Sequence, residues 1–176
     1  MDAAARNPYL GAVLDDLYNT DILGLAGSLQ AARLSAPDGT ARRTAKLCGS
    51  ELEIDVEMDG ERVADVALRV RACALGQASA AVLERGIVGA TLEDIETARD
   101  ALRAMLKDGA AAPTGRFAEL AALSGVAGYP ARHQSVMLAW EAAVDAVRAA
   151  TGESDGTGDE TVDDGRGGAG AAGGMR

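Results

Sequence analysis

Residues 51–58 alternate strictly between apolar and acidic side chains, and this run restricts the chain to folds that contain a half-buried β-strand. The apolar positions are Leu52, Ile54, Val56 and Met58, and the acidic positions are Glu51, Glu53, Asp55 and Glu57. Asp59-Gly60, which follows, is typical of a hairpin turn. Residues 63–71 then alternate again, with Val66, Leu68 and Val70 on one face. The sequence therefore predicts an antiparallel hairpin with one buried face and one face toward water.

Most of the remaining apolar spacing is helical. Helices are expected over residues 7–29, 74–85, 91–107, 116–123 and 134–150. A further short strand is expected over 42–47, and a loop over 125–130. Because the strands are grouped and most helices follow them, the order favours an α+β fold: a small antiparallel sheet of about three strands with helices packed on one face.

The composition changes at residue 151. Nine of the last 26 residues are glycine, and six acidic residues occur there with two arginines. Such a segment cannot bury enough apolar surface to offset the entropy lost on ordering it. A folded domain is therefore expected over 1–150, and a disordered, acidic, glycine-rich tail over 151–176.

The charge of the chain excludes several classes of partner. The formal net charge is −10, which argues against a protein that binds nucleic-acid phosphates or an anionic membrane surface. No apolar run reaches the roughly 18 residues that a membrane-spanning helix needs. The first residues do not resemble a secretory signal, so a cytoplasmic protein with reduced cysteines is expected.

Two cysteines offer the most chemistry. Cys48 lies between two extended segments, and Gly49 permits a tight turn that exposes the thiol. Arg42, Arg43 and Lys46 precede Cys48 and are expected to favour the reactive thiolate. The alternative is a small buried hydrophobic residue, since a free cysteine is often buried.

Cys73 lies where the second hairpin strand gives way to a helix, whose free N–H groups carry partial positive charge. Residues 74–80 are mostly small, which lets a bound group approach the backbone; close packing of the helix on the sheet is the alternative. His133, the only histidine, is a candidate third metal ligand or an idle exposed residue. Ser135 is expected to cap the last helix. Two cysteines 25 residues apart do not make a metal motif alone, because structural zinc needs four ligands.

Four segments, taken together, resemble the U-type iron–sulfur scaffold family, which comprises IscU, the N-terminal domain of NifU and SufU. These segments are 14–18, 47–49 with the strand that follows, 73–80 and 125–140. They resemble, in order, the first helix, the first and second cysteine segments and the third-cysteine segment of the family. The interval of 62 residues between Cys73 and Ser135 suits the SufU branch.

The chain departs from the family pattern at two positions. Ser50 replaces the usual aspartate after Cys-Gly, and Ser135 replaces the third cysteine. Cys48 and Cys73 remain as the main ligands that the resemblance implies, with Ser50, Ser135 and His133 as weaker candidates. A serine hydroxyl is neutral at pH 7 and is therefore a much poorer metal ligand than a thiolate.

The resemblance implies a role in iron–sulfur cluster assembly, with a transient [2Fe–2S] cluster or iron as cargo. Cys48 would accept persulfide sulfur from a cysteine desulfurase, and Cys73 would bind metal or cluster. Recipient iron–sulfur proteins or cluster carriers would take the product. A scaffold is favoured over an enzyme. A zinc-dependent sulfurtransferase is the second hypothesis, and a family member without a working site, acting only as a binding or regulatory partner, is the third.

Overall fold

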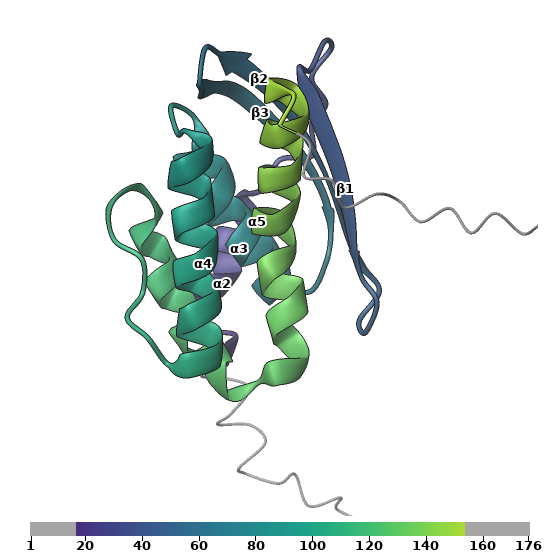
Figure 1. The fold of residues 1–176 in the computed structure, drawn as a ribbon. Helices are drawn as coiled ribbons and strands as arrows, with labels where there is room; N and C mark the ends of the chain where they lie inside the picture. The colour runs from purple at the N-terminus through teal and green to yellow at the C-terminus, as the bar shows by residue number, and fades with distance from the viewer. Residues whose placement is uncertain (1–16, 154–176) are drawn as a thin grey trace, which may run out of the picture.

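A computed structural model of the chain describes residues 17–153 (Figure 1). Its elements are α2 (Thr20–Ser28), β1 (Gly39–Ala45), β2 (Ser50–Asp59), β3 (Arg62–Arg71), α3 (Ala74–Ile87), α4 (Leu92–Asp108), the 3₁₀ segment η1 (Gly115–Gly128) and α5 (Pro130–Thr151). The strands form one antiparallel sheet in the order β1-β2-β3. The helices lie on one face of this sheet, with α5 directly against it (Figure 1). The expected α+β class is confirmed.

The hairpin has the predicted apolar face, with a register shift between Glu57 and Met58. Ile54 lies opposite Leu68 and Val56 opposite Val66, so the apolar sets of β2 and β3 share the face that packs on the helices. Gly60 has a φ of 60°, which the turn requires and glycine adopts without strain. β1 ends at Ala45 rather than at residue 47, because the chain turns over 46–49 before β2 begins.

The expected start and end of α4 are also confirmed. The Thr91 hydroxyl accepts a hydrogen bond from the Asp94 N–H at 3.2 Å, and the Asp94 carboxylate accepts one from the Thr91 N–H at 2.9 Å. This reciprocal pair satisfies two backbone donors at the helix start. Gly109 ends the helix with a φ of 66°.

The helix expected over 7–29 is wrong at its centre. Asn19 is extended, and its side chain accepts a hydrogen bond from the Ile22 N–H at 3.0 Å, so a new helix begins at Thr20. The apolar spacing continues through this point and gives no sign of the break, because a capping side chain is decided by local geometry. Residues 7–16 of the predicted helix lie outside the described residues.

The last helix begins earlier than expected. Pro130 occupies its first turn, where the fixed φ of proline suits a helix start and its missing N–H costs nothing. Residues 125–128, expected to be a loop, belong to the 3₁₀ segment η1. Ser135 is therefore no cap but an interior residue of α5, with only 1% of its surface exposed. Glu153 is the last described residue, so the predicted tail over 151–176 lies almost wholly outside the described residues.

A buried hydrogen-bonded chain joins α3 to α5. Trp140 is fully buried and packs edge-to-face on Phe117, with ring centroids 4.8 Å apart. Its indole N–H donates to the Ser79 hydroxyl at 3.0 Å, and that hydroxyl donates to the Val136 carbonyl at 2.7 Å. These bonds fix the two helices relative to each other. In the described part of the chain, no helix is long and apolar enough to cross a membrane.

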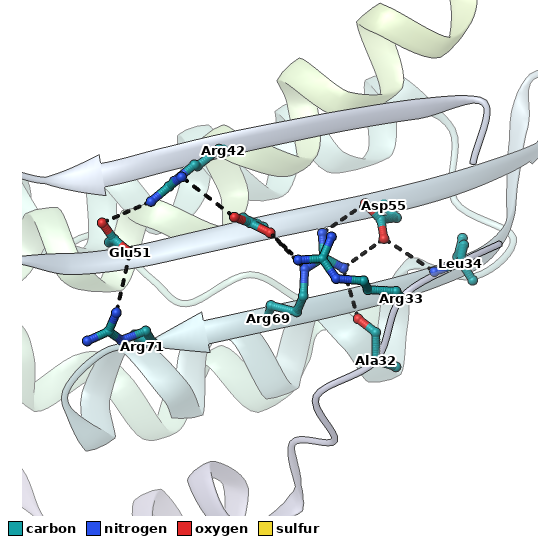
Figure 2. Close-up of polar contacts among 9 residues, drawn as sticks. Ala32, Arg33, Leu34, Arg42, Glu51, Asp55, Arg69 and Arg71 are labelled. Atoms are coloured by element: carbon teal, nitrogen blue, oxygen red, sulfur yellow. Dashed lines mark hydrogen bonds and ion pairs between the residues drawn. The ribbon is translucent and has the colours of Figure 1, made fainter. Parts of the chain in front are cut away.

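The outer face of the sheet is an ion-pair network rather than a freely hydrated surface. Arg69 donates to Asp55 through its two terminal guanidinium nitrogens, at 2.7 and 2.9 Å, and to Glu53 through Nε at 2.8 Å (Figure 2). It also donates to the Ala32 carbonyl at 2.9 Å, while Asp55 accepts from the Leu34 N–H at 3.2 Å. The expectation of water-facing acids is corrected at Asp55, which is buried because the chain segment before β1 covers it.

We expect Arg69→Met to destabilise the fold by about 2 kcal/mol at neutral pH, because it leaves Asp55 without its charged partner while the Asp55 side chain stays 7% exposed. Arg69 holds the pKa of Asp55 below its usual range. The stabilisation is therefore complete above the unfolded pKa of about 4 and is lost as the pH falls through the lower folded value. Urea unfolding at neutral and acid pH measures both effects.

Arg33→Met is the matched control for this prediction. The Arg33 side chain is 70% exposed and forms a single contact with Glu53, so its loss should change stability little. Equal destabilisation by the two substitutions would contradict the special role of the buried Asp55 pair.

Candidate functional site

Cys48 lies in the tight turn between β1 and β2. The turn is closed by a hydrogen bond from the Gly49 N–H to the Ala45 carbonyl at 2.9 Å, and Gly49 has a φ of 68°. This left-handed conformation suits glycine, as expected from the sequence. The Cys48 residue is exposed, so its thiol is open to an incoming partner. The alternative of a buried hydrophobic role is excluded for Cys48.

Cys73, Ser50 and Ser135 form a thiol–hydroxyl cluster with Cys48. Cys73 is the N-cap residue of α3, is partly exposed, and makes no side-chain capping bond. Its sulfur lies 3.5 Å from the Ser135 hydroxyl of α5. The Ser135 hydroxyl lies 3.3 Å from the Ser50 hydroxyl, which in turn lies 3.1 Å from the Cys48 sulfur. The fold thus brings together four of the five candidate residues, from three separate segments.

The missing side chain of Gly76 gives Ser135 its room. A Cβ atom built on Gly76 would lie 2.5 Å from the Ser135 hydroxyl oxygen and 2.9 Å from the Ala72 Cβ. Such approaches are too close for real atoms, so helices α3 and α5 can meet at this point only through glycine. The run of small residues after Cys73 was the sequence signal for close packing here. The expected partner was the sheet, but at Gly76 the close contact is with helix α5.

The serine hydroxyls also set the acidity of the exposed thiol. The hydrogen bond from Ser50 is the main cause that lowers the pKa of Cys48 below its ordinary value. Partial burial opposes this shift, while Ser135 and the positive charge of Arg132 lower the pKa of Cys48 further. A lower pKa means more thiolate near neutral pH, and the thiolate is the nucleophile.

Two of the three cations that the sequence analysis named, Arg42 and Arg43, are engaged away from Cys48. Arg43 forms a bidentate pair with Asp145 of α5, at 2.6 and 3.0 Å, and Arg42 binds Glu51 at 3.1 Å. Their charges are thus engaged by acids that the fold places beside them. Arg132 acts on Cys48 instead. It lies one helical turn before Ser135, and no local sequence pattern relates it to Cys48, 84 residues away.

His133 is not brought into the cluster. Its Nε2 atom lies 3.0 Å from the Val126 carbonyl oxygen of η1. The ring also lines a surface pocket with Leu106, Pro130 and Met137, on the side of α5 that faces α4. Within residues 17–153, no group of three or more His, Cys, Asp or Glu side chains is arranged to hold a metal ion. The structure therefore does not place His133 beside the two cysteines as a third ligand.

We expect Ser50→Ala to slow the alkylation of Cys48 several-fold near neutral pH and to move the midpoint of its pH–rate profile to higher pH. The substitution removes the hydroxyl that contributes most to the lowered pKa of Cys48. Iodoacetamide labelling followed by peptide mass spectrometry measures the rate at each cysteine.

Ser28→Ala is the control, because its hydroxyl bonds only the Leu25 carbonyl of its own helix. An unchanged Cys48 profile in Ser50→Ala would show that this hydroxyl does not stabilise the thiolate.

Comparison with known proteins identifies the family of the chain. Residues 9–149 match the family described as NifU-like N terminal domain. The chain is 23% identical to an iron–sulfur cluster assembly scaffold protein IscU of Streptococcus pyogenes, over 80% of this chain and 82% of that protein. It is 29% identical to a zinc-dependent sulfurtransferase SufU of Bacillus subtilis, over 54% of this chain and 65% of that protein.

A solved structure shares the same fold. It is the N-terminal part of a nitrogen-fixing NifU-like protein from Brucella abortus, with a TM-score of 0.77 and 40% identity, and the match covers 81% of this chain and 99% of that one. The family match spans most of the chain and includes every residue of the thiol–hydroxyl cluster formed by Cys48, Ser50, Cys73 and Ser135. The chain belongs to the NifU-like N-terminal domain family, the family of IscU- and SufU-type scaffolds.

Proposed function

We propose that this protein is a scaffold in iron–sulfur cluster assembly, and that Cys48 and Cys73 are the residues that handle sulfur and the nascent cluster. One observation carries this proposal: two thiols from separate segments lie within hydrogen-bond reach of one pair of serine hydroxyls. Cysteines that only filled the core would not be expected to lie around one pair of hydroxyls at an exposed site. This observation disfavours a chain that has lost its site.

Cys48 has the properties of a sulfur acceptor. It is exposed, it lies on a tight turn between two strands, and its pKa is lowered. In the proposed step, the Cys48 thiolate attacks the outer sulfur of a persulfide on a cysteine desulfurase. A new sulfur–sulfur bond forms, the old one breaks, and the thiolate of the desulfurase leaves. Cys48 then carries the transferred sulfur as a persulfide.

Cys73 is suited to hold the cargo. Its sulfur is partly exposed and lies at the start of α3, where free backbone N–H groups carry partial positive charge that attracts an anionic sulfur or cluster. A [2Fe–2S] cluster is held by four thiolates, of which one chain supplies two. The remaining ligands come from a second copy or from other thiols, and recipient iron–sulfur proteins or cluster carriers take the cluster on.

Zinc, in contrast, does not fit the donors that are present. A protein zinc site is built from at least three Cys, His, Asp or Glu side chains. Cys48 and Cys73 are the only such residues in the thiol–hydroxyl cluster. Residues 17–153 contain no group of three or more His, Cys, Asp or Glu side chains that could hold a metal ion. The two remaining neighbours are neutral hydroxyls. The zinc dependence in the name of the Bacillus subtilis relative is therefore not transferred to this site.

Incubation with a cysteine desulfurase, its pyridoxal phosphate and cysteine tests the proposed role. We expect the mass of the protein to rise by one sulfur atom, located on Cys48 by peptide mapping. Anaerobic incubation with iron, sulfide and a thiol reductant should then give visible absorption typical of a [2Fe–2S] cluster. Fully reduced protein that acquires neither sulfur nor colour would argue for a purely regulatory partner. The two free thiols suit the reducing cytoplasm, where we place this activity.

A further inference from the structure

We propose that the Ser50 and Ser135 hydroxyls take the place of a resident metal ion between Cys48 and Cys73, so that this chain accepts sulfur and begins iron–sulfur assembly without a bound metal. The inference rests on the proposed function for what the two thiols do. It goes beyond that function by stating what organises the thiols between reactions.

The first argument is the continuity of the hydrogen bonds. The Cys48 sulfur lies 3.1 Å from the Ser50 oxygen, the two serine oxygens lie 3.3 Å apart, and the Ser135 oxygen lies 3.5 Å from the Cys73 sulfur. A hydroxyl can donate one hydrogen bond and accept two, so the pair links both sulfurs. Among the described residues, no buried side-chain nitrogen or oxygen lacks a partner. The thiol–hydroxyl cluster therefore contains no buried side-chain oxygen that lacks a hydrogen-bond partner and would need an ion to satisfy it.

The second argument is the burial of the two hydroxyls. Ser50 is 4% exposed and Ser135 is 1% exposed, although both lie beside cysteines that reach the surface. A buried hydroxyl without a partner is costly, so their mutual hydrogen bond stabilises this arrangement. The backbone of α3 at Gly76 packs closely against the Ser135 hydroxyl, so any larger residue there would collide with the Ser135 oxygen. The position of the Ser135 hydroxyl is thus set by packing rather than by a ligand.

The third argument is the chemistry of the donors. Tetrahedral zinc needs anionic or imidazole ligands, and a serine hydroxyl is neutral near pH 7. His133 bonds the Val126 carbonyl, and no acidic side chain joins the two cysteines among residues 17–153. Two thiolates alone leave half of the coordination sphere to water. The two serines, whose hydroxyls contact the sulfurs, are the positions at which a carboxylate and a thiolate would complete it.

A zinc titration of the reduced full-length protein tests the proposal. Native protein, Ser50→Asp and the double variant Ser50→Asp/Ser135→Cys compete with a chromophoric chelator for Zn²⁺. We expect the double variant to bind one Zn²⁺ per chain roughly a thousandfold more tightly than native protein, since even an outer-shell group changes metal affinity 10- to 100-fold. Co²⁺ should give the absorption of a tetrahedral thiolate site in the double variant and not in native protein.

Each outcome of the titration decides the proposal. Native protein that binds one Zn²⁺ within tenfold of the double variant, and loses it in Cys48→Ser, would overturn it. Folded variants that gain no affinity for Zn²⁺ would also overturn it, because the missing ligands would not then be what excludes zinc. Circular dichroism and Trp140 fluorescence establish folding. If the double variant does not fold, the native measurement and the single Ser50→Asp variant decide in the same way.

Sulfur transfer separates this inference from the proposed function. Native protein treated with excess chelator should accept sulfur on Cys48 at a rate within about twofold of untreated protein. Acceptance that the chelator abolishes and Zn²⁺ restores would overturn the metal-free proposal and leave the scaffold role intact. Protein that never accepts sulfur, with or without Zn²⁺, would contradict the role of Cys48 as acceptor, while the zinc affinities would still decide the question of the metal.

Discussion

Cys48→Ser should lower the rate of sulfur acceptance from a cysteine desulfurase by roughly a hundredfold or more, because a serine hydroxyl is hardly ionised near neutral pH and is a weak nucleophile unless a base activates it. The described neighbours of Cys48 are two serines and the cation Arg132, none of which is such a base. Serine has nearly the same shape as cysteine, and the site is exposed, so the fold should remain intact. Mass spectrometry of the protein after incubation with the desulfurase and cysteine measures the loss.

Cys73→Ser is the matched control for this experiment. It removes the other thiol of the same cluster but leaves the turn at residues 46–49 unchanged. We expect this variant to accept sulfur at nearly the native rate and to lose the visible absorption of the reconstituted cluster. The assignment of Cys48 as acceptor would be wrong if Cys48→Ser kept native sulfur acceptance, or if Cys73→Ser alone abolished it.

Gly76→Ala should destabilise the fold by about 1 kcal/mol, since overpacking a filled interface costs about 1–3 kcal/mol and the gain in helix propensity of about 1 kcal/mol offsets only part of it. The added methyl group would lie 2.5 Å from the Ser135 oxygen and 3.1 Å from the Ser135 carbonyl, so α3 and α5 must move apart. This movement would separate Cys73 from Ser135, and cluster reconstitution should fall with stability. Urea unfolding followed by the fluorescence of Trp140, the single tryptophan, gives the free energy of unfolding.

Gly27→Ala is the control for the effect of alanine on a helix. Gly27 lies in α2, and a Cβ atom added there meets no atom within 4 Å. We expect this variant to be stabilised by roughly 0.5–1 kcal/mol, the ordinary gain from replacing glycine in a helix. If Gly76→Ala were stabilised by a similar amount, the close approach of α3 and α5 would not limit what residue 76 can be.

The hairpin could be predicted because it depends on patterns that are local in the chain. Alternation places Leu52, Ile54 and Val56 on one face of a strand, whatever covers that face. Thr91 and Asp94 likewise mark a helix start by their spacing alone. The break at Asn19 was missed because apolar spacing continues across it. The start of α5 at Pro130 was missed because the polar residues 132–135 gave no apolar spacing, and glycine and proline before them suggested a loop.

The sequence by itself determined the fold class, the antiparallel hairpin and the two cysteines as the residues of interest, because strand and helix periods and residue chemistry are properties of short segments. Only the tertiary structure decided which side chains meet. It placed Ser135 between the sulfurs through the glycine contact of α3 and α5, engaged Arg42 and Arg43 with acids, and turned His133 toward Val126. Contacts between residues 62 or 85 positions apart depend on how whole helices pack, which no local pattern encodes.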